Sequence, residues 1–303
     1  MNPAKAPFRA TYFPPSDMRV ERRADGTLVV EPVTELAPFI PNLPAQLSEW
    51  AARDPDRPCM AERAGKGGPW VEYSFGQFKH AADAVTQWLI NQRPPAGRSL
   101  LILSGNSIAH AVVKFGGMAA GVPVCPVSAN YSLMPGDFGR LRHVVKLVKP
   151  AVVFAEQTSQ FKRALETVDF GDAIVVTADP SALARPAVAF ADVLATTVTP
   201  AVEQAIAAID PDAHSLYMLT SGSTSMPKAV VQTQRMVTAN VAQARQVLAQ
   251  TAGWTETMLD WLPWSHVSGA CNQFATLCSG GRFYIDGGRP MPGLFEESLR
   301  NIK

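Results

Sequence analysis

The 303-residue sequence predicts an α/β protein with stacked, mostly parallel sheets and flanking helices. From about residue 99 to residue 176, apolar runs of strand length alternate with stretches of helical spacing, an order typical of βαβ units. Hydrophobic residues make up 47% and charged residues 17% of the chain, which is typical of globular rather than disordered proteins. The chain shows no long internal repeat, and this excludes a solenoid.

The first 42 residues predict an arm that packs on a domain. They are rich in proline, and Asp25-Gly26 predicts a turn between two short strands. A helix is expected over 43–53, followed by strands at 59–62 and 70–73 that pair around a glycine-rich turn.

The clearest helix of the chain begins at Phe75, where aromatic and aliphatic side chains recur at helical spacing. Ser74 is placed to cap its first turn, and Asn106 or Ser107 to cap a later one. His110 is expected at the surface. Further strands are predicted at 99–103, 122–127, 151–155 and 173–176, and further helices at 108–120, 137–148, 161–168 and 201–208.

Residues 179–211 are weakly patterned and predict a junction between subdomains. The expected organisation is an arm over 1–42, a first α/β subdomain over 43–210 and the start of a second over 211–303. In that last part, strands are predicted at 216–219, 229–231, 258–262 and 282–285, and helices at 234–250, 272–277 and 294–302. The helix over 234–250 should bury a face carrying Met236, Val237, Val241, Ala244 and Leu248.

Net charge, apolar content and cysteine count limit the classes of binding partner and cellular compartment. A net charge of +1 argues against nucleic acid or an anionic membrane as partner. The most apolar stretch, 111–127, contains a lysine and a proline, which argues against a membrane span. The four cysteines show no metal spacing, and the N-terminus shows no signal peptide, so we expect a cytoplasmic protein with reduced thiols. The totals leave the oligomeric state open.

The most informative stretch is the loop between the strands at 216–219 and 229–231. It holds Thr220, Ser221, Gly222, Ser223, Thr224 and Ser225, followed by Met226, Pro227 and Lys228. Backbone N–H groups and hydroxyls can surround phosphate oxygens, and Lys228 adds a positive charge. Thr224 or a neighbour can supply an oxygen to Mg²⁺. By itself such a run is more often a solvated turn, but the flanking strands and the Pro-Lys pair favour phosphate binding. No Gly-Lys-Ser/Thr opens a helix after it, so it is not a Walker A loop.

A second stretch, from Asp260 to Gly269, follows a strand end and contains Trp264, Ser265 and His266. Loops at strand ends are where α/β proteins place residues that contact ligands. A lone histidine such as His266 is more often structural, so its role depends on context.

These stretches together resemble the adenylate-forming superfamily of acyl-CoA ligases. The superfamily's phosphate-binding signature usually reads Thr-Ser-Gly-(Ser/Thr)-Thr-Gly-x-Pro-Lys-Gly, and here Ser225 and Ala229 stand where glycine is usual. The resemblance runs from about residue 40 to the end and is greatest to feruloyl-CoA synthetase and its close relatives. The stretches that carry this closer resemblance are 103–110, 121–128, 131–133, 141–143, 260–266 and 284–288.

The resemblance implies the N-terminal portion of the adenylate-forming fold, without its C-terminal lid. It implies an AMP-forming acid–thiol ligase that uses ATP, Mg²⁺ and coenzyme A, acting on a feruloyl- or hydroxycinnamic-type acid in aromatic acid catabolism. Thr220, Ser221, Gly222, Ser223, Thr224 and Lys228 would then bind the ATP phosphates, with Thr224 also at the metal. Trp264, Ser265 and His266 would bind the acid, with His266 as the catalytic residue.

Two other functions stay open from the sequence. One is a fatty-acyl or benzoyl-CoA ligase of the same superfamily, which differs only in the acyl pocket. The other is a catalytically inactive, truncated remnant that at most binds nucleotide. Ser225 favours the second, because a residue with a Cβ atom adopts positive φ less readily than glycine.

Overall fold

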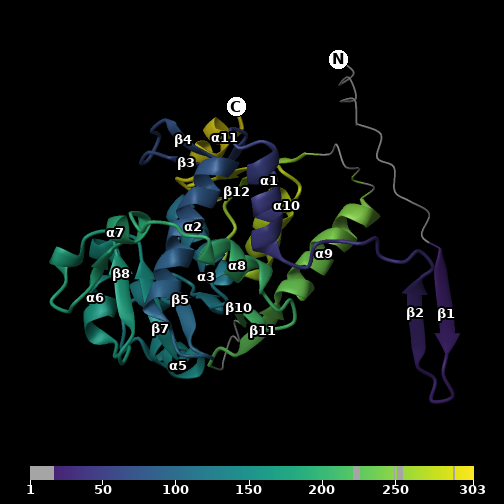
Figure 1. Ribbon diagram of the computed structural model, residues 1–303, viewed down its shortest axis with the longest axis horizontal. Helices are drawn as coiled ribbons and strands as arrows, with labels where there is room; N and C mark the ends of the chain where they lie inside the picture. The colour runs from purple at the N-terminus through teal and green to yellow at the C-terminus, as the bar shows by residue number, and fades with distance from the viewer. Residues whose placement is uncertain (1–16, 221–225, 249, 251–254, 289–290) are drawn as a thin grey trace.

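Three sheets organise the part of the chain that the structure describes (Figure 1). The computed structural model describes residues 17–220, 226–248, 250, 255–288 and 291–303. Within the described part, most neighbouring strands of the two larger sheets run parallel. This confirms the predicted α/β class.

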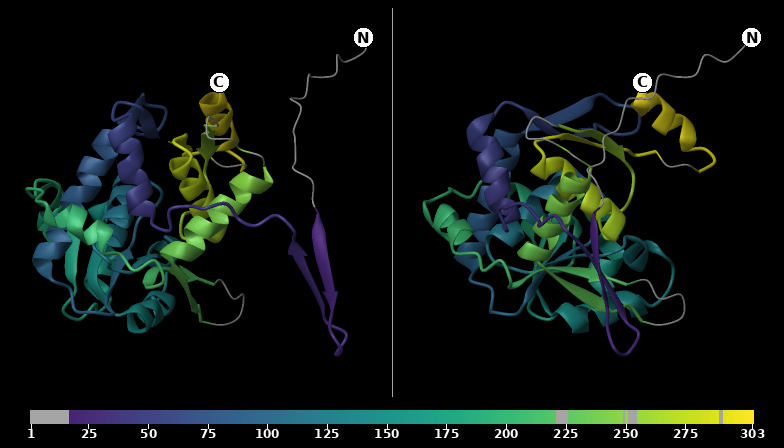
Figure 2. Two further views of the ribbon diagram at one scale, coloured as in Figure 1. Left: turned by 45° about the vertical axis from the view of Figure 1, so that its right-hand side comes forward. Right: turned by 90° about the vertical axis from the view of Figure 1, so that its right-hand side faces the viewer.

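The smallest sheet is an antiparallel hairpin of β1 (Met18–Arg22) and β2 (Leu28–Pro32). Its side chains are exposed apart from the half-buried Val29, and it stands away from the body in Figure 1 and in the left view of Figure 2. The expected turn at Asp25-Gly26 is therefore confirmed, but the expectation that this part of the arm packs on a domain is wrong. The segment after the hairpin is bound to the helix over 234–247. There the Gln246 side chain accepts a hydrogen bond from the Ala37 N–H at 2.9 Å and donates one to the Glu35 carbonyl at 3.0 Å.

The largest sheet has seven strands in the order β11-β10-β6-β5-β7-β8-β9. Among its described strands, β10 and β11 form the one antiparallel pair of this sheet. The strands are β5 (Ser99–Ile102), β6 (Val124–Pro126), β7 (Pro150–Ala155), β8 (Ile174–Thr177), β9 (Val188–Ala189), β10 (His214–Leu219) and β11 (Ala229–Thr233). In β5, Leu100 and Ile102 enter one core cluster while Leu101 enters the other, because successive strand side chains point to opposite faces. Both faces of the sheet are therefore covered.

The four-stranded sheet has the order β12-β13-β3-β4. Its strands are β3 (Pro58–Arg63), β4 (Trp70–Ser74), β12 (Thr257–Asp260) and β13 (Arg282–Ile285). It thus joins strands from near the beginning and the end of the chain, while β10 and β11 belong to the seven-stranded sheet. The expected boundary between 43–210 and 211–303 does not coincide with this division, because strand pairing links segments far apart in sequence.

Most helices begin and end close to their predicted limits. Ser74 forms a capping box with Gln77, and Ser107, rather than Asn106, caps α3. The helices are α1 (Leu43–Arg53), α2 (Phe75–Gln92), α3 (Ile108–Ala119), α4 (Asn130–Leu133), α5 (Gly139–Val148), α6 (Thr158–Thr167), α7 (Phe190–Leu194), α8 (Ala201–Ala207), α9 (Gln234–Val247), α10 (Val267–Cys278) and α11 (Phe295–Ile302). Among the described residues, no helix combines the length and apolar character that a bilayer crossing requires.

The buried face of α9 differs from the predicted one. Met236 is 54% and Leu248 is 50% exposed, contrary to the prediction, whereas Val241 is buried as predicted and Gln234 and Thr238 are buried beside it. The buried amide of Gln234 makes two hydrogen bonds. It accepts from the Leu43 N–H at 3.1 Å and donates to the Ser215 hydroxyl at 2.8 Å. Hydrogen bonds therefore decide which face of this helix turns inward, and apolar periodicity does not detect them.

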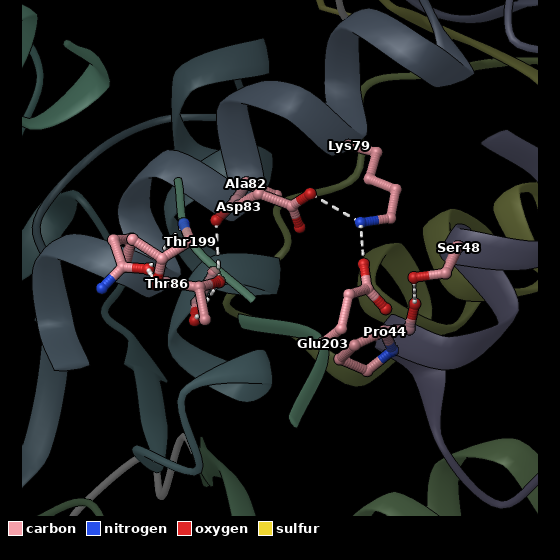
Figure 3. Close-up of polar contacts among 10 residues, drawn as sticks. Pro44, Ser48, Lys79, Ala82, Asp83, Thr86, Thr199 and Glu203 are labelled. Carbon is pink, nitrogen blue, oxygen red and sulfur yellow. Dashed lines mark hydrogen bonds and ion pairs between the residues drawn. The ribbon is translucent and has the colours of Figure 1, made fainter. Parts of the chain in front are cut away.

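A polar network ties α2 to α8 (Figure 3). The Lys79 ammonium lies 2.5 Å from Asp83 and 2.7 Å from Glu203. Burial raises the pKa of the Asp83 carboxyl even though Lys79 opposes this effect by hydrogen bonding and charge. The junction before β10 is thus fastened to the helical layer by a partly buried ion pair.

Candidate functional site

The base of the predicted phosphate loop is closed by two residues that flank it. The Thr220 N–H donates to the Lys228 carbonyl at 2.9 Å, and the Lys228 N–H donates to the Thr220 hydroxyl at 3.3 Å. Ser221, Gly222, Ser223, Thr224 and Ser225 lie outside the described residues. Their assignment to ATP phosphates, and that of Thr224 to Mg²⁺, stays a prediction.

Lys228 presents an exposed side chain at the loop base, and its ammonium makes no hydrogen bond to a described residue. A cation in this position suits a polyanionic ligand. His143 on α5 contacts the neighbouring residue Pro227. The ring nitrogen Nε2 of His143 lies 3.0 Å from the Pro227 carbonyl oxygen. This contact could not be predicted from the sequence, because residues 143 and 227 are far apart in the chain.

The turn after β12 is built around a buried carboxylate. Asp260 is 6% exposed and accepts from the Leu262 N–H and from the Asn272 amide, both at 2.8 Å. The expected turn through Gly269 ends earlier than predicted, because α10 begins at Val267. Gly269 lies inside that helix, where a Cβ atom would come 2.5 Å from the Leu262 carbonyl oxygen. A side chain at this position would push α10 away from the turn.

The predicted catalytic residue, His266, stands immediately before α10 and is exposed. Its imidazole makes no hydrogen bond to the described part of the chain, so it is available to a ligand. Its neighbour Ser265 is 8% exposed.

Asn106 connects this turn to the end of β5. Its amide donates to the Leu262 carbonyl at 2.8 Å and accepts from the Trp264 N–H at 3.0 Å. Of the two predicted caps, Asn106 and Ser107, the structure selects Ser107, which leaves the Asn106 amide for the turn.

The two predicted loops lie at the same edge of the seven-stranded sheet. β5, β6 and β10 run parallel, so their carboxyl ends share one edge. Thr220 follows β10 directly, and Asn106, which follows β5, holds the turn with Trp264. The fold thus places two stretches about forty residues apart in the sequence along one edge.

Trp264 itself faces the core. It is 0% exposed, and its ring centroid lies 5.1 Å from that of His110 and 5.8 Å from that of Phe283. The assignment of Trp264 to direct contact with the acid is therefore revised, because its indole is covered on all sides. It supports the turn from beneath.

An apolar cavity of about 200 Å³ separates β10 from α10. α9 and α10 flank it and pack side by side (Figure 1). Cys271 and Asn240 add two of its few polar groups, with the Cys271 sulfur 3.8 Å from the Asn240 side-chain oxygen. The lining residues are Leu216, Met218, Gln232, Met236, Val237, Asn240, Val241, Val267, Ala270, Cys271 and Phe274. No charged side chain of the described residues lines the cavity.

Beneath the turn lies a buried polar cluster of His110, Lys114, Trp264 and Gln273. His110 is 2% exposed, so its predicted place at the surface is wrong. Burial, together with the charge of Lys114, lowers the pKa of His110 to about 3, and burial lowers the pKa of Lys114 to about 7. The signal in the sequence was Lys114 itself, the charged residue within the apolar stretch 111–127.

Comparison with known proteins gives a family match over most of the chain. The family described as AMP-binding enzyme matches residues 47–303. A curated relative, a sulfoacetate–CoA ligase of Cupriavidus necator, is 26% identical over 243 residues, which are 79% of this chain and 44% of that protein. The chain therefore spans less than half the length of that relative.

Solved structures agree on the fold. A fatty acid AMP ligase from Legionella pneumophila matches with a TM-score of 0.65 at 15% identity, over 87% of this chain and 42% of the other. ATP-bound MatB from Rhodopseudomonas palustris matches with a TM-score of 0.64 at 19% identity, over 82% of this chain and 45% of the other. VinN matches with a TM-score of 0.63 at 18% identity, over 80% and 56%. These likenesses confirm the predicted portion of the adenylate-forming fold.

Proposed function

The chain belongs to the AMP-binding enzyme family, and from this premise we propose that the protein containing it is an ATP-dependent acid–CoA ligase. The carboxylate of the acid attacks the α-phosphorus of ATP and releases pyrophosphate, which leaves an acyl-adenylate. The thiol of coenzyme A then attacks the acyl carbon and releases AMP. The observation that carries this proposal is the shared sheet edge of the loop closed by Thr220 and Lys228 and the turn that ends at His266.

Lys228 acts in the first step. Its exposed ammonium at the base of the loop neutralises charge on the phosphates as negative charge shifts onto pyrophosphate. Thr220 to Thr224 complete the phosphate contacts, and Mg²⁺, held through the phosphates and Thr224, would neutralise further charge. His266 and Ser265 stand on the side of the acid and the adenylate, where His266 orients the reacting carboxylate.

The acid is of the feruloyl or hydroxycinnamic type. The cavity beside α10 supports this substrate class, because its lining is apolar with a few neutral polar groups. A second anionic group, such as the sulfonate of sulfoacetate, would be buried there without a cationic partner, which is costly. Benzoic and fatty acids share the apolar character and are the competing substrates.

The test is acid-dependent ATP–pyrophosphate exchange in the natural protein that contains these residues. We expect exchange with ferulate to exceed exchange with benzoate, decanoate or sulfoacetate. Lys228→Ala should abolish it, whereas Lys146→Ala on the exposed face of α5 should not. Unchanged exchange in Lys228→Ala would remove the phosphate-loop assignment. Greater exchange with another acid would overturn the substrate class alone.

A further inference from the structure

We propose that Lys114 is a positioning residue for the acid-binding side of the site, fixing α10 and the turn before it from inside the core. The role of Lys114 in acid binding rests on the proposed function. Its structural part, the link from Lys114 to α10, can be tested without any ligand.

The contacts of Lys114 reach both elements that shape the acid side. Its side chain is 0% exposed, and its amine donates to the Gln273 side-chain oxygen on α10. The amine also lies 5.0 Å from the centroid of the Trp264 ring and 4.8 Å from that of Phe274. Trp264 directly precedes Ser265 and His266, and Phe274 lines the apolar cavity.

A lysine in this place lowers stability relative to an apolar residue of the same length, because its amine loses its hydration. Among the described residues, the titratable side chain that interacts electrostatically with it is His110, on the same helix, and no carboxylate compensates it. Gln273 and the faces of two aromatic rings are its polar partners. Methionine would fill the same space at a lower desolvation cost, so the buried amine indicates a role other than stability.

The rest of the cluster shows why this link matters. The Nε2 atoms of His110 and Gln273 and the Nε1 atom of Trp264 are buried without a hydrogen-bond partner among the described residues. With these groups unpaired, the cluster depends on the amine of Lys114 for a direct polar contact between α3 and α10. Removing that amine should let α10 shift relative to α3.

Cys271 reports such a shift without any substrate. It lies on α10 at the cavity and is half-buried, whereas Cys59, Cys125 and Cys278 are buried. We expect Lys114→Met to increase the rate of Cys271 modification by a thiol reagent at least fivefold. Lys146→Met is the matched control and should leave the rate unchanged, and Cys271→Ser identifies the reacting thiol.

Gln273→Leu removes the acceptor while keeping Lys114 and serves as the second variant if Lys114→Met fails to fold. If the Lys114–Gln273 contact transmits the effect, the double change should increase the modification rate no more than the larger single change does. Multiplicative effects of the two changes would overturn the link, as would an unchanged rate in either folded variant.

Kinetics then test the positioning role. In the natural protein, Lys114→Met should increase KM for the acid about tenfold and leave KM for ATP within twofold. Equal changes in both constants would show a general loss of structure and overturn the proposal. If no acid supports exchange in the unaltered protein, the ligase proposal fails, and the Cys271 rates still decide whether Lys114 holds α10.

Discussion

The side-chain amide of Asn106 accepts the backbone N–H of Trp264 at 3.0 Å. Because the same amide donates to the Leu262 carbonyl at 2.8 Å, one side chain at the end of β5 holds both sides of Pro263. This pair links the two sheets at the edge where both candidate loops lie.

Asn106→Ala should weaken both stability and activity. It leaves the Trp264 N–H and the Leu262 carbonyl without their partner, which costs about 1 to 3 kcal/mol of the free energy of unfolding. Denaturant unfolding measures this loss. Asn106→Asp keeps an acceptor for the Trp264 N–H but sets a carboxylate oxygen against the Leu262 carbonyl oxygen, so it should also be destabilising. Equal stability of the alanine variant and the unaltered chain would contradict the clamp.

His143→Ala should increase KM for ATP about fivefold, the effect of losing one hydrogen bond worth about 1 kcal/mol. The imidazole lies 3.0 Å from the Pro227 carbonyl and steadies the base of the loop next to Lys228. Steady-state kinetics with ATP varied provides the measurement. His80→Ala, an exposed change on α2, is the control and should leave KM unchanged.

Lys79→Met should destabilise the chain by about 2 kcal/mol, between the values for exposed and buried ion pairs. It leaves Asp83, whose side chain is 15% exposed, without its cation. Lys162→Met breaks the more exposed pair with Glu166, so thermal unfolding should show a much smaller loss. A larger loss for Lys162 than for Lys79 would contradict the role of burial.

Stability should rise with pH above about 7 because of Lys114. Burial lowers the pKa of its amine from 10.5 to about 7 in the folded chain. Between these values the unfolded chain holds a proton that the folded chain has released, so unfolding takes up a proton and becomes less favourable as pH rises. The gain is about 1.4 kcal/mol per pH unit.

The comparison of the unaltered chain with Lys114→Met isolates this effect near and above pH 7. The change also removes the charge that helps to lower the pKa of His110 to about 3, but that imidazole is neutral in the folded chain near pH 7. Denaturant unfolding between pH 5.5 and 8.5, chosen on either side of the pKa of about 7, provides the measurement. The difference between the two chains should be constant below about pH 7 and shrink above it. A difference that does not change with pH would show that the amine titrates normally.

The sequence alone determined the order and class of the elements. Strand-length apolar runs and the capping residue Ser74 are local signals, and they placed most strands and helices within a few residues of their observed limits. The same holds for the strand–loop–strand unit that carries Thr220 and Lys228 and for the family resemblance that the AMP-binding match confirmed. Such features depend on neighbouring residues, so a single sequence contains them.

Tertiary structure alone decided which residues meet. Asn106, one of two predicted helix caps, instead binds the backbone of a distant turn. His110 lies in the core rather than at the predicted surface position, and Trp264 is buried beneath the turn. Asn106 and His110 both contact Trp264, which lies more than 150 residues later in the chain. The periodicity of apolar residues does not encode contacts over such a separation. The sequence suggests candidate residues for the site, and packing between the two sheets determines where those residues lie.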